Sequence, residues 1–286
     1  MNIREQTRRF RKKFLPLADK SSWPFISGDT YLNLCDIALS KNMLNEIKGN
    51  IFHLISQKKN VFLPADLVPQ LTQLLQNSEI PPLLNWNLVI HNGDHSPSTD
   101  NMRILHTNFA DIHSVNWMGP SELASPIPIG LENWDYLRNG VPSDYLRESR
   151  KIETFANRDI LLFSSFNLST NLQERKQAFE AIPKLDKIIT TQKFLPPHKY
   201  RKLVRNAKFV LSPPGNGIDC HRTWEAIYLG AVPIVKRSFW PFNHYTLPVL
   251  VVNDWDDISE EIANYQPSDN ITREELQNLF LNFLKK

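Results

Sequence analysis

Short apolar runs alternate with amphipathic segments along the chain, most regularly in its C-terminal half. Apolar runs there predict strands at 159–163, 208–211, 232–235 and 247–252, and the segments between them predict helices at 172–182, 200–207 and 219–229. Strands that alternate with helices are typical of βαβ units, and right-handed crossovers between them build a parallel sheet. The predicted fold class is therefore α/β.

The N-terminal half shows a similar but less regular alternation. Strands are predicted at 60–63, 87–90 and 103–106 and a helix at 65–77, while the prolines in 126–129 indicate an edge strand or an extended loop. The polar residues 91–95 directly follow the strand at 87–90. Because ligands collect at the carboxyl ends of parallel strands, we expect this polar run to face a cleft.

A polar, charge-rich stretch at 139–158 separates the two halves and shows little strand pattern. A chain of 286 residues is long enough for two domains, so we place the boundary in this stretch. The prediction is an N-terminal domain at 1–150 and a C-terminal domain at 151–286, both Rossmann-like and facing a central cleft. Apolar residues at helical spacing in 272–284 predict a terminal helix that docks on one of the domains.

The composition, with 41% hydrophobic and 22% charged residues, is that of a folded protein. The net charge is +3, but basic residues crowd the start of the chain, where the only acid is Glu5: Arg4, Arg8, Arg9, Arg11, Lys12 and Lys13. Such a segment is a candidate for contact with an anionic membrane surface or with nucleic acid. A solvated terminus is the simpler interpretation, and we expect no nucleic-acid partner.

Cys35 and Cys220 lie far apart in the sequence and indicate no disulfide framework. No apolar run approaches the roughly eighteen residues needed to span a bilayer. The apolar residues after the basic segment are also too few for the core of a signal peptide. We therefore expect a cytoplasmic location, with peripheral membrane contact only through the basic segment.

The segment 212–235 combines a strand end, a glycine-containing loop, a helix, a tight turn and a second strand. Gly215 and Gly217, which flank Asn216, let the backbone approach a ligand closely. Asp219 is the predicted N-cap of the helix. A loop that leads into a helix N-terminus attracts anions, because free N–H groups and the helix dipole both favour negative charge there. This segment therefore predicts a phosphate site.

Arg222 lies in the first turn of this helix, where its guanidinium group can clamp a diphosphate through two N–H groups. Glu225 follows three residues later on nearly the same face and can accept hydrogen bonds from ribose hydroxyls. His221 borders the same region. The alternative is an exposed ion pair between Arg222 and Glu225, which would stabilise the helix by only about 0.3–0.5 kcal/mol. The glycines and the flanking strands favour a binding site.

This helix and the strand after it resemble the donor-site signature of the exostosin-like (GT47-type) glycosyltransferases in the pattern Arg222-x-x-Glu225-Ala226-Ile227-x-x-Gly230-x-x-Pro233-Ile234-Val235. The resemblance is specific over 208–236. It implies the two-domain GT-B fold and transfer of a hexosyl or pentosyl group from a nucleoside-diphosphate-sugar, with inversion and without an essential metal. On this analogy Arg222 binds the diphosphate and Glu225 the ribose.

Further candidates lie in the loops that follow predicted strands. Ser164 and Ser165 follow the strand at 159–163, where a GT-B donor domain supplies contacts to phosphate; the alternative is a polar turn that caps the next helix. An inverting transfer also needs a base that takes the proton of the acceptor. Asp94 and His95, in the polar run of the N-terminal half, are the first candidates for this catalytic role.

His113 and Glu132 are reserve candidates for the base. The sequence Asp254-Trp-Asp256 resembles a metal-binding D-x-D, but its position between a strand and an acidic helix favours a turn with capping aspartates. The histidines and cysteines show no metal-ligand spacing. We predict no metal site and no cofactor apart from the nucleotide-sugar itself.

The predicted function is transfer of a sugar from a nucleoside-diphosphate-sugar to a glycan or lipid-linked acceptor. The alternative is a non-catalytic nucleotide-sugar-binding protein of the same fold, which would bind the nucleotide-sugar without turnover. A dinucleotide-dependent oxidoreductase is disfavoured because neither half has G-x-G-x-x-G between a strand and a helix. Binding of nucleic acid through the basic segment would predict a steep salt dependence.

Overall fold

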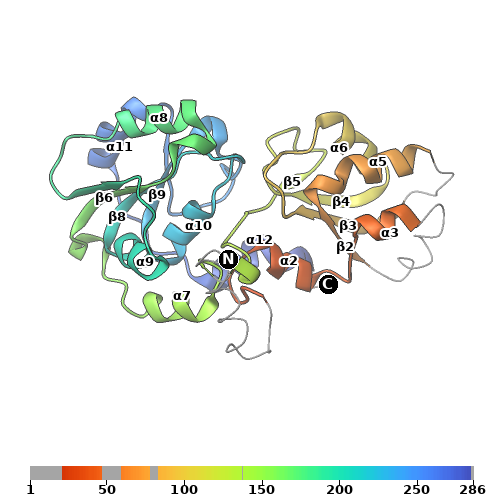
Figure 1. The fold of residues 1–286 in the computed structure, drawn as a ribbon, viewed down its shortest axis with the longest axis horizontal. Helices are drawn as coiled ribbons and strands as arrows, with labels where there is room; N and C mark the ends of the chain where they lie inside the picture. The colour runs from red at the N-terminus through yellow and green to blue at the C-terminus, as the bar shows by residue number, and fades with distance from the viewer. Residues whose placement is uncertain (1–20, 47–58, 78–82, 137, 285–286) are drawn as a thin grey trace, which may run out of the picture.

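In the computed structural model the described residues are 21–46, 59–77, 83–136 and 138–284, and they form two five-stranded sheets. All the strand pairs in both sheets are parallel. Figure 1 shows the two sheets side by side, with helices from both ends of the described chain between them. The basic segment at the start of the sequence lies outside the described residues.

The N-terminal sheet has the strand order β1-β2-β3-β4-β5, so each strand pairs with the next in sequence. Its elements are β1 (Ile37–Ala38), α3 (Lys41–Glu46), β2 (Asn60–Pro64), η1 (Ala65–Leu67), α5 (Val68–Gln76), β3 (Leu83–His91), α6 (Thr99–His106), β4 (Phe109–Ser114) and β5 (Ser125–Pro126). Each right-handed crossover leads to the next strand on the same side of the previous one, so the connecting helices α3, α5 and α6 all cover the same face of the sheet (Figure 1). The other face is left for α2 (Gly28–Leu34) and α12 (Arg273–Leu281).

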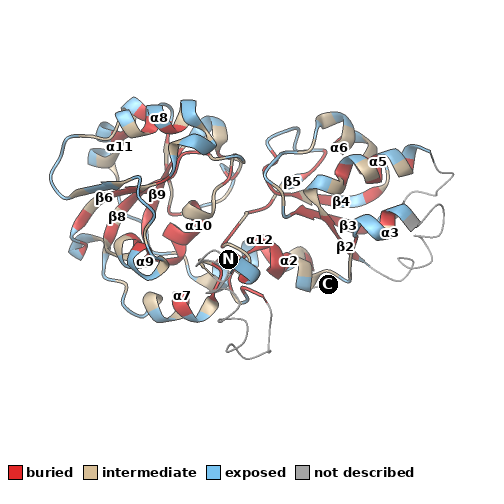
Figure 2. Cartoon of the chain, viewed as in Figure 1, coloured by how far each residue is buried: buried red, intermediate tan, exposed pale blue. Residues whose placement is uncertain are grey.

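Successive residues of β2 point to these two faces. Val61 and Leu63 belong to the core beneath α5 and α6. Phe62, between them, belongs to a second core that contains Tyr31 of α2 and Phe280 of α12. Both faces of the sheet are therefore buried, which explains why its strands read as continuous apolar runs, and Figure 2 shows them as buried ribbons beneath partly exposed helices.

The C-terminal sheet has the strand order β10-β9-β8-β6-β7. Its elements are α7 (Pro142–Ser149), η3 (Phe155–Asn157), β6 (Ile160–Ser165), η4 (Leu168–Thr170), α8 (Leu172–Glu180), β7 (Ile188–Thr191), α9 (Pro197–Asn206), β8 (Ala207–Leu211), α10 (His221–Tyr228), β9 (Val232–Lys236), η5 (Arg237–Phe239), β10 (Leu250–Val252), η6 (Trp255–Asp257) and α11 (Ile258–Asn264). The chain adds β7 on one side of β6 and then returns to add β8 on the other side. In parallel sheets, ligands bind at such a switch point, outside the carboxyl ends of the strands.

The C-terminal helix α12 packs on both halves of the molecule. Its Phe280 makes an edge contact with Trp224 of α10, with ring centroids 5.7 Å apart. The carbonyl of Phe280 also accepts a hydrogen bond from the hydroxyl of Tyr31 at 3.3 Å. In η7 (Asn282–Leu284), which follows, Phe283 stacks on His113 of β4 at 3.5 Å. The helix was expected to dock on one domain, and it instead closes a core that the two halves share.

Two segments differ from the sequence prediction. The strand predicted at 103–106 is wrong, because these residues belong to α6, which the Ser98 hydroxyl caps by accepting a hydrogen bond from the Asn101 N–H at 3.2 Å. The charge-rich stretch at 139–158 contains α7, whose Asp144 forms an ion pair with a buried arginine of α9. The strands β1, β4 and β7 are additions that the pattern did not predict. The domain boundary at residue 150 stays a prediction.

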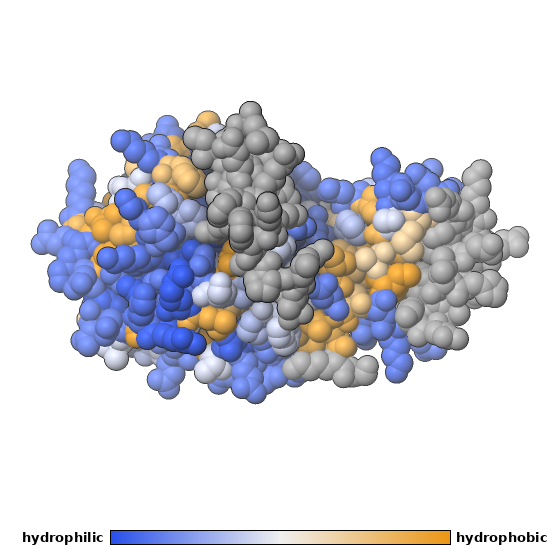
Figure 3. Space-filling model, turned by 60° about the horizontal axis from the view of Figure 1, so that its bottom comes forward, coloured by the Kyte–Doolittle hydropathy of each residue, from blue (hydrophilic) through white to orange (hydrophobic). Residues whose placement is uncertain are grey.

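The predicted α/β fold class is confirmed by the two parallel sheets, one in each half. No described helix is both long enough and apolar enough to cross a bilayer. On the face shown in Figure 3, hydrophilic residues dominate the C-terminal half, whereas apolar colouring gathers over the N-terminal half.

Candidate functional site

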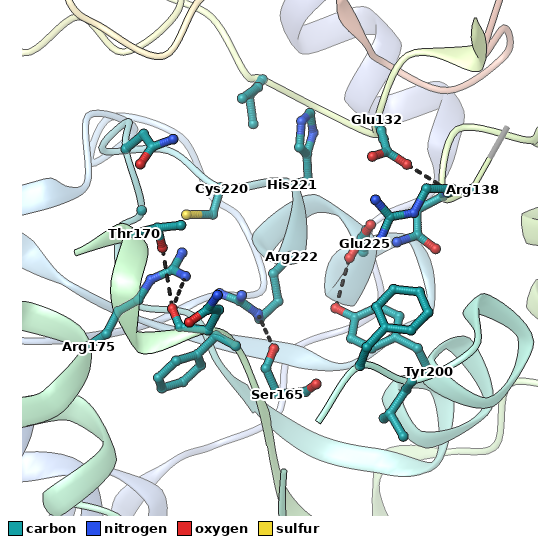
Figure 4. Close-up of a pocket in the computed structure, with 18 of the residues that line it drawn as sticks. Glu132, Arg138, Ser165, Thr170, Arg175, Tyr200, Cys220, His221, Arg222 and Glu225 are labelled. Carbon is teal, nitrogen blue, oxygen red and sulfur yellow. Dashed lines mark hydrogen bonds between the residues drawn. The ribbon is translucent and has the colours of Figure 1, made fainter. Parts of the chain in front are cut away.

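A pocket of about 510 Å³ lies between the two halves, at the switch point of the C-terminal sheet (Figure 4). The C-terminal half lines it with residues from the segments after β6, β7 and β8 and from the first turns of α10. The N-terminal half contributes Asp94, Ile129, Glu132, Arg138 and Asn139. The strand order thus places a pocket where the topology of a parallel sheet favours ligand binding.

Two arginines meet in this pocket, Arg175 from α8 and Arg222 from α10 (Figure 4). Both guanidinium groups lie near the ring of Phe166, with their central carbons 5.7 Å and 5.2 Å from its centroid. Arg175 donates from Nη1 to the carbonyl of Asn167 at 2.6 Å. Arg222 donates from Nε to the carbonyl of Ser165 at 3.2 Å. The loop after β6 therefore positions both cations.

Neither Arg175 nor Arg222 forms an ion pair with a carboxylate of the described residues, whereas the buried Arg201 pairs with Asp144 at 2.5 Å. Burial, and secondly the positive charge of Arg222, lowers the pKa of Arg175. The Nη1 atom of Arg222 is buried and has no hydrogen-bond partner among the described residues. Unpaired cations in such surroundings are costly. The pair is suited to an anion with two or more charges, such as a diphosphate.

Glu225 lies on the other side of Arg222 in the pocket and is only 4% exposed. Its Oε2 accepts a hydrogen bond from the hydroxyl of Tyr200 at 2.8 Å, and the other carboxylate oxygen forms none among the described residues. Burial raises the pKa of Glu225. The alternative of an exposed ion pair between Arg222 and Glu225 is therefore wrong. The carboxylate is held inside the pocket, where a sugar hydroxyl can donate to it.

The two glycines of the loop after β8 make room for side chains. A Cβ atom on Gly215 would lie 2.7 Å from Nη2 of Arg175. One on Gly217 would lie 2.7 Å from Nδ2 of Asn116, which belongs to the N-terminal half. Gly215 thus admits a guanidinium group to the pocket, and Gly217 allows the two halves to pack closely.

Asp219 does not cap α10 as the sequence predicted. The helix begins at His221, and its N-cap is Cys220, with no side-chain hydrogen bond. The carboxylate of Asp219 instead accepts hydrogen bonds from the N–H of Ile129 at 2.8 Å and from the indole of Trp224 at 2.8 Å. Burial raises the pKa of Asp219 to about 6. This side chain therefore ties the start of α10 to the N-terminal half.

A second pocket of about 430 Å³ adjoins the first, and Asp94, Ile129 and His221 line both. The carboxylate of Asp94 accepts a hydrogen bond from the side-chain amide of Asn216 at 3.0 Å, across the two halves. His95 lines the second pocket and not the first. The polar run after β3 therefore faces the cleft as expected, and Asp94 occupies the junction of the two pockets.

His221 also lies at this junction, and its tautomer follows from one contact. Its Nδ1 atom is 2.8 Å from the carbonyl oxygen of Gly130. Because a carbonyl only accepts, Nδ1 carries a hydrogen in this contact. The Nε2 atom forms no hydrogen bond among the described residues. A neutral His221 therefore offers an accepting nitrogen at the junction that Asp94 also lines.

Most of the predicted site residues come together in the first pocket: Asp94, Ser165, Gly215, Asn216, Gly217, His221, Arg222 and Glu225. Ser164 is buried within β6 and lines neither pocket. Of the reserve candidates for the base, Glu132 lines the first pocket. His113 is stacked on Phe283 and lines neither.

Arg175 is the main residue of the pocket that sequence reasoning did not assign. It lies in the first turns of α8, which follows β6, as Arg222 lies in the first turn of α10, which follows β8. The strands β6 and β8 are neighbours at the switch point. An arginine near the start of both α8 and α10 was the available signal, but the pairing of β6 with β8 was needed to bring the two side chains together.

No group of three or more His, Cys, Asp and Glu side chains in the described part of the chain is arranged to hold a metal ion. Of the D-x-D aspartates, Asp254 is the N-cap of η6, as predicted: it shares a capping box with the following Asp257, whose carboxylate accepts from the N–H of Asp254 at 2.9 Å. Asp254 also pairs with Lys236 at 3.2 Å. The expectation that the protein needs no metal and no cofactor stays a prediction.

No protein-family model matches the chain. Among solved structures, an α,α-trehalose-phosphate synthase (UDP-forming) from Burkholderia xenovorans, in complex with glucose-6-phosphate, is similar with a TM-score of 0.48 and 12% identity, over 85% of this chain and 76% of that chain. An α,α-trehalose 6-phosphate synthase from Burkholderia multivorans is similar with a TM-score of 0.47 and 11% identity, over 97% and 78% of the two chains. The membership in the exostosin-like family stays a prediction.

Proposed function

We propose that this protein is a glycosyltransferase that transfers a hexosyl or pentosyl group from a nucleoside-diphosphate-sugar to a glycan or lipid-linked acceptor. The observation that carries the proposal is the pair of guanidinium groups of Arg175 and Arg222, which lies at a sheet switch point and has no carboxylate partner among the described residues. Arginine matches the geometry of phosphate oxygens by donating two parallel hydrogen bonds. The signature around Arg222 and Glu225 supports the same function.

In this proposal the diphosphate lies between Arg175 and Arg222, and the ribose hydroxyls donate to the buried carboxylate of Glu225. The sugar then extends toward the junction of the two pockets, where Asp94 and His221 line both. This order places the reacting carbon of the sugar where an acceptor in the second pocket can approach it.

Transfer proceeds with inversion in a single displacement. The acceptor oxygen forms its bond to the anomeric carbon while the bond from that carbon to the diphosphate breaks, and the diphosphate leaves with the electron pair. Asp94 takes the acceptor proton, with His95 as the neighbouring alternative. The two guanidinium groups stabilise the negative charge of the leaving diphosphate. Because they take the place that a divalent cation could fill, the proposed reaction is metal-independent.

The alternative, a nucleotide-sugar-binding protein without turnover, uses the same first pocket and differs only at the junction. The cytoplasmic location and the membrane contact of the basic segment also remain part of the proposal. Release of nucleoside diphosphate from the nucleotide-sugar separates the transferase from the binding protein.

The first test is calorimetric binding of UDP, GDP and CDP, with magnesium and with a chelator. One of these nucleotides should bind the wild type, and Arg222→Ala should weaken its binding about 10–100-fold, because charge-assisted hydrogen bonds contribute roughly 1.5–3 kcal/mol each. The matched control is Arg237→Ala, which removes an exposed arginine outside both pockets. If no nucleotide binds the wild type under either condition, the proposed function is wrong.

A further inference from the structure

The second pocket differs from the first in the charge of its lining. It is lined by Asp66, His91, Asn92, Gly93, Asp94, His95, Ile129, Asn133, Tyr136 and His221. No lysine or arginine of the described residues lines it. The first pocket, by contrast, contains Arg138 and Lys193 in addition to the arginine pair. The two adjoining pockets are therefore suited to ligands of different charge.

Two carboxylates face the second pocket, and neither forms an ion pair with a described residue. Asp66, in the turn after β2, forms no hydrogen bond and no ion pair with a described residue, and it is exposed. Asp94 has only the neutral amide of Asn216 as a side-chain partner. A phosphate group in this pocket would therefore meet the like charge of both carboxylates, with no lysine or arginine of the described residues to offset it.

His91 does not supply the missing positive charge. It is 2% exposed, and its Nδ1 accepts a hydrogen bond from the N–H of Asn92 at 2.7 Å. Its Nε2 lies 3.1 Å from the carbonyl of Pro128, so Nε2 carries the hydrogen. Burial lowers the pKa of His91 to about 4, which keeps the ring neutral at pH 7.

The remaining lining suits the hydroxyls and the apolar face of a sugar. The side-chain amides of Asn92 and Asn133 both reach the pocket and form a hydrogen bond to each other at 3.0 Å. The Tyr136 ring is 55% exposed, and an aromatic ring beside polar groups offers a surface on which a sugar can stack. Carboxylates and amide oxygens accept hydrogen bonds from hydroxyls.

We propose that the second pocket is the acceptor subsite and that it takes an uncharged, hydroxyl-rich sugar rather than a phosphorylated one. The proposal rests on the proposed transferase function. The acceptor hydroxyl then points to the junction with the first pocket, and Asp66 accepts a hydrogen bond from a second hydroxyl of the same sugar.

The test uses the full chain and the nucleotide-sugar that matches the nucleotide found to bind. Release of nucleoside diphosphate is measured with glucose, mannose and N-acetylglucosamine and with the 6-phosphate of each, and the products are identified by mass spectrometry. Unphosphorylated sugars should stimulate release at least tenfold more than their phosphates. Asp66→Asn should raise the KM for the acceptor about tenfold, the loss of one charge-assisted hydrogen bond, and leave the Kd of the nucleotide unchanged.

The matched control is Asp100→Asn, which removes an exposed carboxylate of α6 outside both pockets and should change neither constant. Preference for the phosphorylated sugars would overturn the inference. So would a wild type that binds the nucleotide but is stimulated by no sugar of either set, or an Asp66→Asn variant with an unchanged KM. A wild type that binds no nucleotide would instead overturn the proposed function, so the two failures are distinguishable.

Discussion

The two halves of the chain build similar five-stranded parallel sheets but use them differently. The N-terminal sheet adds its strands in sequence order, whereas the C-terminal sheet reverses direction at β6. The reversal separates the loops that follow β6 and β8 and leaves room between two helix starts, each of which carries an arginine. The N-terminal sheet has no such reversal of strand order, and its loop after β3 instead lines the two pockets from the opposite side. The topology of each sheet therefore determines which half can hold a diphosphate.

The halves also differ in the charges that line the cleft. The C-terminal side holds Arg175 and Glu225, whereas the second pocket holds the carboxylates of Asp66 and Asp94 and the neutral ring of His91. Such an arrangement keeps an anionic nucleotide on one side of the junction and an uncharged acceptor on the other.

The largest effect is expected at Asp94, the group that we place between the two substrates. Asp94→Asn keeps the size of the side chain and an oxygen that can accept from Asn216, but it removes the group that takes the proton. The kcat should fall about 10²–10⁴-fold, the usual contribution of a general base, while the Kd of the nucleoside diphosphate stays unchanged. Steady-state kinetics and calorimetry on the same preparation measure the two quantities.

His95→Gln identifies which of the two adjacent groups acts as the base. A larger loss of kcat in His95→Gln than in Asp94→Asn would transfer the role to the histidine. If neither variant loses more than about twofold, well below the effect of a general base, the accepting nitrogen of His221 is the remaining candidate at the junction.

A smaller effect is expected at Glu225, on the nucleotide side of the junction. Glu225→Gln keeps an acceptor for the hydroxyl of Tyr200 but removes the charge that strengthens the bonds from ribose. Affinity for the nucleoside diphosphate should fall about tenfold, since a charge-assisted hydrogen bond contributes roughly 1.5 kcal/mol more than none. Calorimetry with the 2′,3′-dideoxynucleoside diphosphate should show no such difference between wild type and variant. An equal loss for both nucleotides would mean that Glu225 acts on the fold and not on the ribose.

Much of the fold could be predicted because both sheets are buried on two faces and their strands read as apolar runs, such as Val61-Phe-Leu63. The prediction was wrong at 103–106, where an apolar pair between two polar residues is too short a pattern to separate a strand from a helix. There the hydroxyl of Ser98 stabilises the helix by capping its N-terminus. The strand β4 was not predicted because Ala110 and Asp111, which point to its two opposite faces, are both exposed, so the strand does not read as a continuous apolar run.

The candidate site could be predicted in part for a similar reason. Arg222, Glu225 and the glycines lie within a dozen residues, so a local pattern reveals them. Arg175 and Asp66 come from distant elements, and only strand pairing brings them to the two pockets. Asp219 was assigned to a helix cap because the sequence does not show that the backbone of Ile129 lies opposite it.

The two halves should also respond in opposite directions to acid. Burial lowers the pKa of His91 and of His113 to about 4, whereas burial raises the pKa of Asp219 to about 6. Between about pH 6.5 and 4 the unfolded state binds more protons at the histidines, so their contribution to stability is present above pH 6.5 and is lost as the pH falls. Between about pH 6 and 4 the folded state binds more protons at Asp219, so that contribution grows as the pH falls.

His113→Phe separates the two contributions with the smallest change. The Phe ring keeps the stack on Phe283, and nothing is lost at Nε2, which is buried without a hydrogen-bond partner. The free energy of unfolding should change by less than about 1 kcal/mol at pH 7.5, and the loss between pH 7.5 and 4.5 should shrink by about 1–3 kcal/mol relative to the wild type. Denaturant unfolding at the two pH values measures this, with the exposed His106→Gln as control. An identical loss in wild type and His113→Phe would contradict the lowered pKa of His113, because a group with the same pKa in the folded and unfolded states contributes nothing to the pH dependence of stability.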